Sequence, residues 1–136
     1  MIKIGFSGTR LGMTIKERAD LESFLILARR PFLNTSEFEL CEFHHGDCVG
    51  ADAEAHEIAT RLGYVVVVHP STHPLRAHCA AKTILPIRKP LDRNHDIVDS
   101  TDMLVAAPSS KTEVLRSGTW ATIRYARKHD KPVIIL

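Results

Sequence analysis

The residues His45 to Asp52, with the sequence HGDCVGAD, place two glycines four positions apart between an apolar run and an amphipathic segment. Glycine lets a backbone approach a bound molecule closely, and the free amides at the start of a helix attract an anion. The spacing of Gly46 and Gly50 therefore predicts a loop that binds a phosphate through its backbone amides. A tight turn from a strand into a helix uses the same residues, so this interpretation depends on the rest of the chain.

Two side chains of this turn are candidate ligand contacts. Asp52 falls in the first turn of the following helix, where a carboxylate either accepts a hydrogen bond from a ribose hydroxyl or interacts favourably with the helix dipole. His45 is either a donor to the ligand or a histidine packed at the end of a strand. Both interpretations stay open for each residue.

A second polar turn follows the first apolar run and consists of Ser7, Gly8, Thr9 and Arg10. An arginine pairs with a phosphate through two parallel hydrogen bonds, and the hydroxyls of Ser7 and Thr9 are further donors. The alternative for Arg10 is a solvated surface charge. This turn therefore predicts a second wall of the same site.

The third group of candidates opens the last helical segment with Ser117, Gly118 and Thr119. A helix start of this kind suits a second phosphate contact, with Ser117 capping the helix, touching the ligand, or both. Trp120 is able to stack on a base, but its spacing from Ile123 favours the core.

A short helix between these segments supplies Arg93 and Asn94, which we expect to reach the ligand from the side of the site. The alternative for Asn94 is a local hydrogen bond at the helix start.

Alternating strand and helix patterns position these residues. Thr14 and Glu17 form a capping-box pattern at the first helix, and the unbroken apolar run at 64–68 indicates a strand buried on both faces. Prolines interrupt residues 70–91, which predicts a surface excursion. The predicted strands are 2–6, 40–45, 64–68, 103–107 and 133–136, and the predicted helices are 14–30, 50–62, 92–100 and 117–128.

This alternation predicts an α/β fold: a Rossmann-like, doubly wound parallel sheet of five strands in the order 3-2-1-4-5, with helices on both faces. Residues 1–136 form a single domain in this prediction. Ligands of such sheets bind beyond the carboxyl ends of the strands where the strand order reverses. The site is therefore expected between the loops that follow the first and fourth strands.

The composition excludes several classes of protein. The formal net charge is only +2 and the basic residues are scattered, so charge gives no reason to expect a nucleic-acid surface. No run of eighteen apolar residues occurs, and three cysteines without a disulfide spacing fit a reducing compartment. We therefore expect a cytoplasmic protein with no membrane partner.

Histidines and cysteines gather in the turn at 44–56 and in the excursion at 69–79, which raises the question of a metal site. Their spacings match no zinc motif, and His44 and His45 would point to opposite faces of a strand. We predict no metal site and no required cofactor.

The motifs taken in order resemble the SLOG superfamily. The resemblance covers nearly the whole chain and is closest to the stand-alone YspA-like branch, which is related to the DprA DNA-processing proteins and to the lysine decarboxylase-like phosphoribohydrolases. It implies a Rossmann-like domain that binds a nucleotide or nucleotide-derived small molecule, often as a homodimer. The matching segments are Gly8-Thr9-Arg10, His45-Gly46, Gly50-Ala51-Asp52, Arg93-Asn94 and Ser117-Gly118-Thr119.

One position departs from the phosphoribohydrolase pattern. Those enzymes have a Gly-Thr-x-x-Glu motif, whose glutamate works with an arginine on the ribosyl bond; Arg93 matches the arginine, but Thr122 replaces the acid. A hydroxyl does not serve as a general base at neutral pH. We therefore expect a ligand sensor or binding module rather than an enzyme.

Two other functions stay open. An N-glycosidic hydrolase would use Arg93 as a catalytic residue, with an acid such as Glu113 in place of the missing glutamate. A DNA-binding accessory protein is the third interpretation, and the small net charge counts against it.

Overall fold

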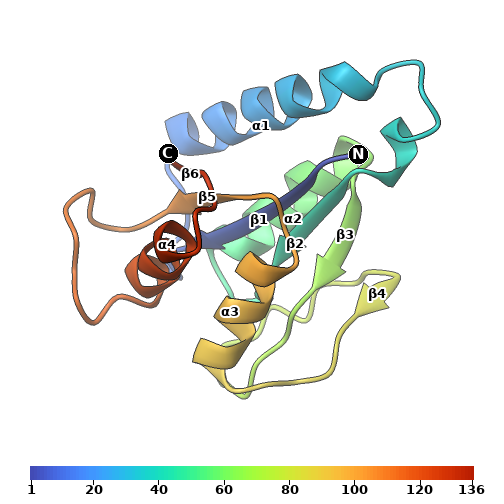
Figure 1. The fold of residues 1–136 in the computed structure, drawn as a ribbon. Coiled ribbons are helices and arrows are strands. Elements are labelled where there is room, and N and C mark those ends of the chain that lie inside the picture. The colour runs from blue at the N-terminus through green and yellow to red at the C-terminus, as the bar shows by residue number, and fades with distance from the viewer.

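A computed structural model describes all residues from Met1 to Leu136 and shows one six-stranded parallel sheet with helices on both faces (Figure 1). The strand order is β4-β3-β2-β1-β5-β6. The strands are β1 (Lys3–Gly8), β2 (Glu42–His45), β3 (Val65–Val68), β4 (Thr83–Ile84), β5 (Met103–Ala107) and β6 (Val133–Ile135). The helices are α1 (Ile15–Arg29), α2 (Ala51–Arg61), α3 (Pro90–Asp99) and α4 (Gly118–Lys128), with short 3₁₀ turns at Arg30–Phe32 and Phe38–Leu40.

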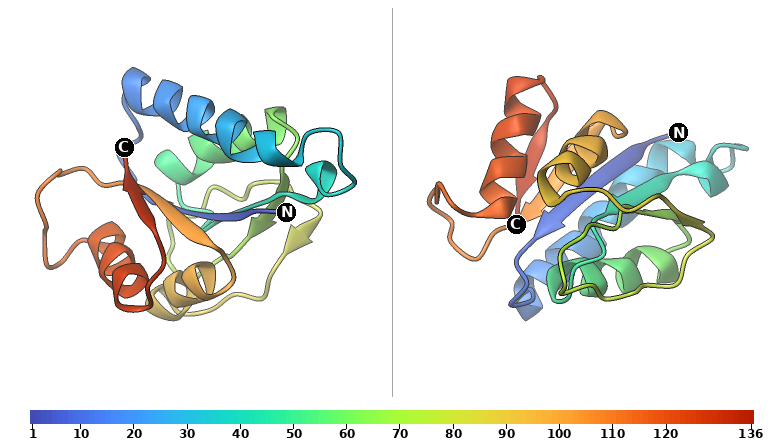
Figure 2. Two further views of the ribbon diagram at one scale, coloured as in Figure 1. Left: turned by 45° about the horizontal axis from the view of Figure 1, so that its top comes forward. Right: turned by 90° about the horizontal axis from the view of Figure 1, so that it is seen from below.

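Each face of the sheet has its own apolar core. Helices α1 and α2 pack on one face, and α3 and α4 pack on the other (Figure 2). Strand β5 serves both, because its side chains alternate: Val105 belongs to the first core, whereas Leu104 and Ala106 belong to the second. None of the helices is long and apolar enough to span a membrane.

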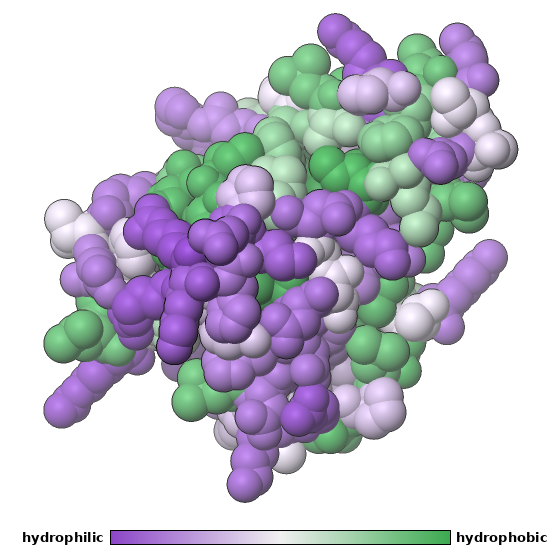
Figure 3. All heavy atoms as spheres, in the orientation of Figure 1, coloured by the Kyte–Doolittle hydropathy of each residue, from purple (hydrophilic) through white to green (hydrophobic).

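The surface over the two helix layers differs in polarity. Hydrophilic residues dominate the face over α3 and α4, and apolar residues become more frequent toward α1 (Figure 3). The exposed apolar residues of α1 include Ile15, Ile26 and Leu27.

The predicted α/β fold and strand order are confirmed. The expected order 3-2-1-4-5 corresponds to β3-β2-β1-β5-β6. The additional strand, β4, lies in the stretch expected to be an irregular excursion, where Thr83 and Ile84 pair with Val67 and Val68. Two residues are too few to produce a periodic pattern, so this pairing left no signal in the sequence.

Local signals placed most helix ends correctly. The capping box is present: the amide of Glu17 donates to Thr14 Oγ1 at 3.0 Å, and the amide of Thr14 donates to Glu17 Oε1 at 2.9 Å. Helix α3 begins at Pro90, two residues before the prediction, because the fixed φ of proline suits a first helical position. Trp120 is buried in the second core, as its spacing indicated.

Candidate functional site

A cavity of about 320 Å³ opens at the carboxyl ends of β1 and β5. The strand order reverses between these two strands, so the cavity lies where ligands of doubly wound sheets bind. The loops after β1, β2 and β5 and the first turns of α3 and α4 form its walls.

Most of the residues singled out from the sequence line this cavity. They are Ser7, Gly8, Thr9, Arg10, Gly46, Asp52, Arg93, Asn94, Ser117, Gly118 and Thr119. His45 and Gly50 do not line it. Sequence reasoning missed Phe6, Cys48, His73, Pro90, Ile97, Ser109 and Arg116.

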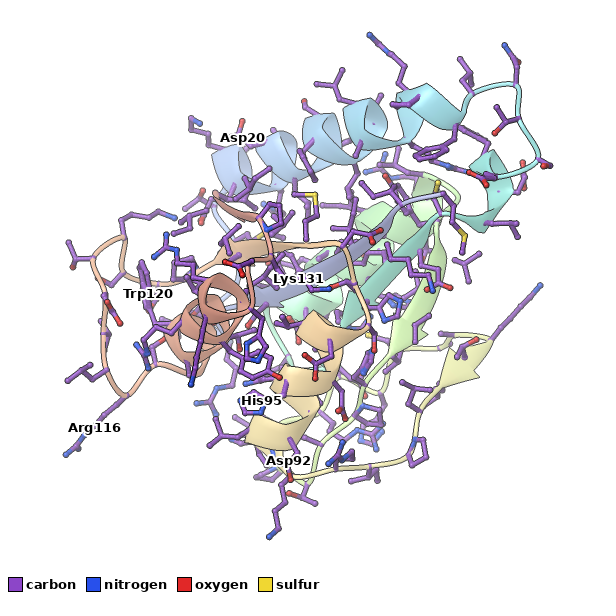
Figure 4. The ribbon with its side chains drawn as sticks, viewed as in Figure 1. Asp20, Asp92, His95, Arg116, Trp120 and Lys131 are labelled. Atoms are coloured by element: carbon purple, nitrogen blue, oxygen red, sulfur yellow. The ribbon has the colours of Figure 1, made fainter.

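Some of the missed residues could have been found from the sequence, and others could not. Cys48 and Arg116 lie within or beside the recognised motifs, so their presence at the cavity follows from the same loops. His73 comes from the excursion after β3, and nothing local indicates that this segment returns to the site. Arg116 extends into solvent from the loop before α4 (Figure 4).

The start of α4 presents donors to the cavity. Ser117 is the N-cap, and its Oγ accepts from the amide of Trp120 at 3.2 Å. The amides of Gly118 and Thr119, the first two helical residues, have no partner within the helix. No atom lies within 4 Å of the position that a Cβ on Gly118 would take, and Gly118 and Thr119 both line the cavity. This helix start suits a bound anion.

The glycines of the β2–α2 turn have a different role from the one expected. A Cβ on Gly46 would lie 2.6 Å from Nη1 of Arg93. Gly50 has φ of +85°, and a Cβ there would lie 2.3 Å from the carbonyl oxygen of Arg10. The positive φ and the backbone contact require glycine at position 50, whereas a Cβ at position 46 would force the guanidinium of Arg93 to move.

Two amides of this turn are bonded to a side chain of the protein. Oδ2 of Asp52 accepts from the amides of Gly46 and Cys48, each at 3.2 Å. Neither of these two amides is therefore free to bind a ligand.

The other oxygen of this carboxylate, Oδ1, is the one buried side-chain oxygen or nitrogen without a hydrogen-bond partner. Burial raises the pKa of Asp52 to about 6, and the hydrogen bonds from Cys48 and Gly46 and the charge of Arg93 only partly oppose that rise.

Arg93 is a buried cation without an ion pair. Its side chain is part of a residue only 6% exposed, and no carboxylate lies within ion-pair distance. The guanidinium donates to the carbonyls of Gly46 and His69 and, at 2.8 Å, to Oδ1 of Asn94. These neutral acceptors hold its position, and its charge interacts with the buried Asp52 carboxylate from beyond ion-pair distance. An anion in the cavity would also be attracted to it.

Arg10 meets His73 across the cavity, with Nη1 of Arg10 2.8 Å from Nε2 of His73. Arginine is a donor only, so Nε2 of His73 is the acceptor in this contact. The remaining N–H groups of the guanidinium are able to donate to an anion in the cavity.

Asp47 holds the excursion against the β2–α2 turn and so brings His73 to the cavity. Its Oδ2 accepts from Nε and Nη2 of Arg76 at 3.0 and 2.8 Å, and its Oδ1 accepts from the amide of Cys79 at 2.8 Å. Burial would raise the pKa of Asp47, but the hydrogen bonds from Cys79 and Arg76 and the charge of Arg76 hold the pKa below its ordinary value. No local pattern in the sequence indicates that Asp47 bonds to Arg76 and Cys79.

His45 lies away from the cavity and is fully buried. The amide of Asp47 donates to its Nδ1 at 3.0 Å, which leaves the ring proton on Nε2, 2.9 Å from Nδ1 of His56. Burial lowers the pKa of His45 to about 3, so the ring is neutral. His45 is therefore a histidine packed at the end of a strand, the second of the two interpretations considered for it.

The same pair and Cys79 form the one cluster with metal-ligand geometry, since one ligand atom of each lies within 4.8 Å of the others. A metal at Nε2 of His45 would have to displace the proton that joins His45 to His56 while Nδ1 still accepts from Asp47. We therefore treat the cluster as a hydrogen-bonded histidine pair.

Neither position considered for a hydrolytic acid reaches the cavity. The Thr122 hydroxyl is buried and donates to the carbonyl of Gly118 at 2.9 Å. Glu113 is exposed and pairs with Arg124 at 2.7 Å.

No known family model matches the sequence, and no curated protein is similar to it. Solved structures do match. One match is the molybdenum cofactor binding protein from the phototrophic bacterium Rippkaea orientalis, with 18% identity and a TM-score of 0.64; the match covers 98% of this chain and 75% of that one. Another is DNA processing protein A from Helicobacter pylori, which binds single-stranded DNA, with 22% identity and a TM-score of 0.62; the match covers 98% of this chain and 64% of that one.

A third match is the protein TM1055, a structural genomics target, with 15% identity, a TM-score of 0.60, and coverage of 98% of this chain and 72% of that one. The match to DNA processing protein A is a match to one of the protein groups that the motifs resemble. These three structures, all 22% identical or less, confirm the fold that the resemblance implied.

Proposed function

We propose that the cavity binds a small phosphorylated molecule of the nucleotide class and that the protein acts as a ligand-binding module. The observation that supports this most is the convergence on one cavity of the unpartnered amides of α4 and the buried, unpaired guanidinium of Arg93. These elements are far apart in the sequence, and each favours an anion.

The phosphate belongs at the start of α4. The amides of Gly118 and Thr119 have no partner within the helix, and the positive end of the helix dipole adds to their attraction. Arg10 and the hydroxyl of Ser7 also line the cavity and are further donors for the phosphate.

The size of the cavity favours one nucleotide unit. Its volume of about 320 Å³ lies at the lower end of the range of small-molecule sites, which is about 300–1,000 Å³. Among structures with this fold, one is named for binding the molybdenum cofactor and another for binding single-stranded DNA, so the fold hosts ligand sites of more than one chemistry.

Binding rather than hydrolysis is proposed because Thr122 and Glu113, the two positions considered for an acid, lie off the cavity. The homodimer implied by the SLOG resemblance is part of the proposal, and sedimentation velocity of the purified chain tests it.

Thermal unfolding against AMP, ATP, NAD, ADP-ribose and cyclic AMP tests the ligand class. A ligand at a hundred times its dissociation constant stabilises the folded state by about 2.7 kcal/mol. Arg10→Ala and Gly118→Val should reduce the shift with little change in the unfolding temperature of the free protein, because Arg10 is exposed and contacts only His73, and no atom lies within 4 Å of a Cβ on Gly118. The control is Arg61→Ala, which removes an exposed arginine of α2 remote from the cavity.

No shift with any of these compounds would contradict the proposal. Equal shifts in the wild type and in both cavity variants would place the site elsewhere. Free base in the solutions after the measurement would identify a hydrolase instead.

A further inference from the structure

The cavity contains one polar atom whose bonding is incomplete. Oδ1 of Asp52 is buried without a partner, while every other buried side-chain oxygen or nitrogen has one. Asp52 itself is 4% exposed and lines the cavity. A buried carboxylate oxygen without a donor is energetically unfavourable, so a group that supplies a donor at this place would be bound favourably.

The second oxygen of the same carboxylate closes the turn before α2. Oδ2 holds the amides of Gly46 and Cys48 together, and Asp52 follows them at the second position of the helix. This contact fixes the direction of the carboxylate. It also occupies these two amides, so neither is free to donate to a phosphate at this wall.

The charges around Asp52 come from several elements. Arg93 of α3 faces it as a cation, Asp47 of the turn faces it as an anion, and the thiols of Cys48 and Cys79 lie close enough to be influenced by its charge. Neither cysteine is a strong donor, and Arg93 directs its hydrogen bonds to carbonyls and to Asn94. No protein group therefore supplies the missing donor.

We infer that Asp52 selects the ligand: its Oδ1 accepts a hydrogen bond from a sugar hydroxyl, and its charge and its occupation of the turn amides exclude a second phosphate from this wall. The substrate class is then a sugar phosphate monoester, such as a nucleoside 5′-monophosphate, rather than a dinucleotide. This inference rests on the proposed function, since it presumes that the phosphate lies at the start of α4.

The donors and the acceptor of the cavity suit different parts of a sugar phosphate. The start of α4 and Arg10 offer donors, which suit the oxygens of a phosphate; Asp52 offers an acceptor, which suits a hydroxyl and repels a phosphate. A diphosphate bridge would place a negative group against a carboxylate whose neighbouring amides are already used. The glycine-rich turn thus functions here as a carboxylate holder.

Isothermal titration calorimetry with AMP, 2′,3′-dideoxy-AMP and NAD tests the inference on the wild-type chain and on Asp52→Asn. In the variant the amide oxygen still accepts from Gly46 and Cys48, but the group at the position of Oδ1 becomes a donor. The wild type should bind AMP roughly ten- to a hundredfold more tightly than dideoxy-AMP, which is the range for hydrogen bonds to charged groups. It should bind NAD more weakly than AMP.

In Asp52→Asn a sugar hydroxyl is able only to accept from the new amide, in a neutral hydrogen bond, so the preference for AMP over dideoxy-AMP should fall to about tenfold or less. Asp20→Asn, which changes an exposed carboxylate of α1, is the matched control and should keep the preference. The comparison of ligands on the wild type needs no variant, so it stands even if a substitution disturbs folding.

The outcomes separate the two proposals. Equal wild-type affinity for AMP and dideoxy-AMP, or tighter binding of NAD than of AMP, overturns the assignment of Asp52 and leaves a phosphate site at α4. Absence of binding by all three compounds overturns the proposed function and this inference with it.

Discussion

Asp52→Asn should make the ligand-free protein more stable at neutral pH, although the substitution removes a charge from a helix start. Burial is the reason: it raises the pKa of Asp52 from 3.8 to about 6. The folded state therefore holds this proton more tightly than the unfolded chain, and folding becomes less favourable when the proton is lost.

The pH window and the magnitude follow from these two values. Below pH 4 the carboxyl is protonated in both states and contributes no penalty. As the pH rises from about 4 to about 6 the unfolded chain ionises first, so stability falls; above about 6 both states are ionised and the full penalty remains. A shift from 3.8 to about 6 corresponds to roughly 3 kcal/mol, at 1.36 kcal/mol for each pKa unit.

Asparagine imitates the neutral carboxyl, so roughly 3 kcal/mol is the upper limit of the gain in the free energy of unfolding at pH 7.5. For a domain of this size such a gain raises the unfolding temperature by about 10 °C. A gain of this kind from removing a cavity side chain is typical of residues kept for function at the expense of stability.

Urea denaturation of the wild type and Asp52→Asn at pH 4 and at pH 7.5 measures this effect. The difference between the two proteins is the relevant quantity, because the other carboxylates titrate equally in both. It should be close to zero at pH 4 and favour the variant at pH 7.5. A variant that is less stable than the wild type at pH 7.5, or a difference that does not change with pH, would refute the reasoning.

Three further substitutions test the structure around the site. Asp47→Ala should lower the free energy of unfolding by about 3–5 kcal/mol at pH 7, since it leaves Arg76 and the amide of Cys79 without their buried partner; because the folded pKa of Asp47 is lowered, the loss in denaturant titrations should shrink as the pH falls through that pKa. Gly50→Ala should lower stability by roughly 2 kcal/mol or more, because φ is +85° and the new Cβ overlaps the carbonyl of Arg10; a variant as stable as the wild type by thermal unfolding would contradict the close contact. Thr122→Glu, which restores the phosphoribohydrolase motif, should destabilise the fold and release no base from AMP in a chromatographic assay, because position 122 is 1% exposed and lies off the cavity.

The elements and their order were predictable from the sequence because their signals are local. A run such as Val65 to Val68 indicates a buried strand by itself, and Thr14 and Glu17 mark a helix start within one turn of chain. Handedness and the strand order then place the carboxyl ends of β1 and β5 beside each other. The position of the cavity and most of its walls follow from these rules alone.

The hydrogen-bond partners inside the site depended on tertiary structure. His45 turned toward His56 rather than toward the cavity, and Gly46 made room for Arg93, because helices distant in sequence pack against the same turn. The sequence shows which residues are able to form hydrogen bonds. Which partner each one bonds depends on which groups the fold places within about 3 Å of it.

Asp52 shows both limits. The sequence determined that a carboxylate follows a glycine-containing turn at the start of a helix, which is compatible with a ligand contact or with a favourable charge at the helix start. Only the folded chain decided that one oxygen closes the turn and the other is left buried without a partner. Burial is a property of the whole packed domain, so the raised pKa of this group has no local signature in the sequence.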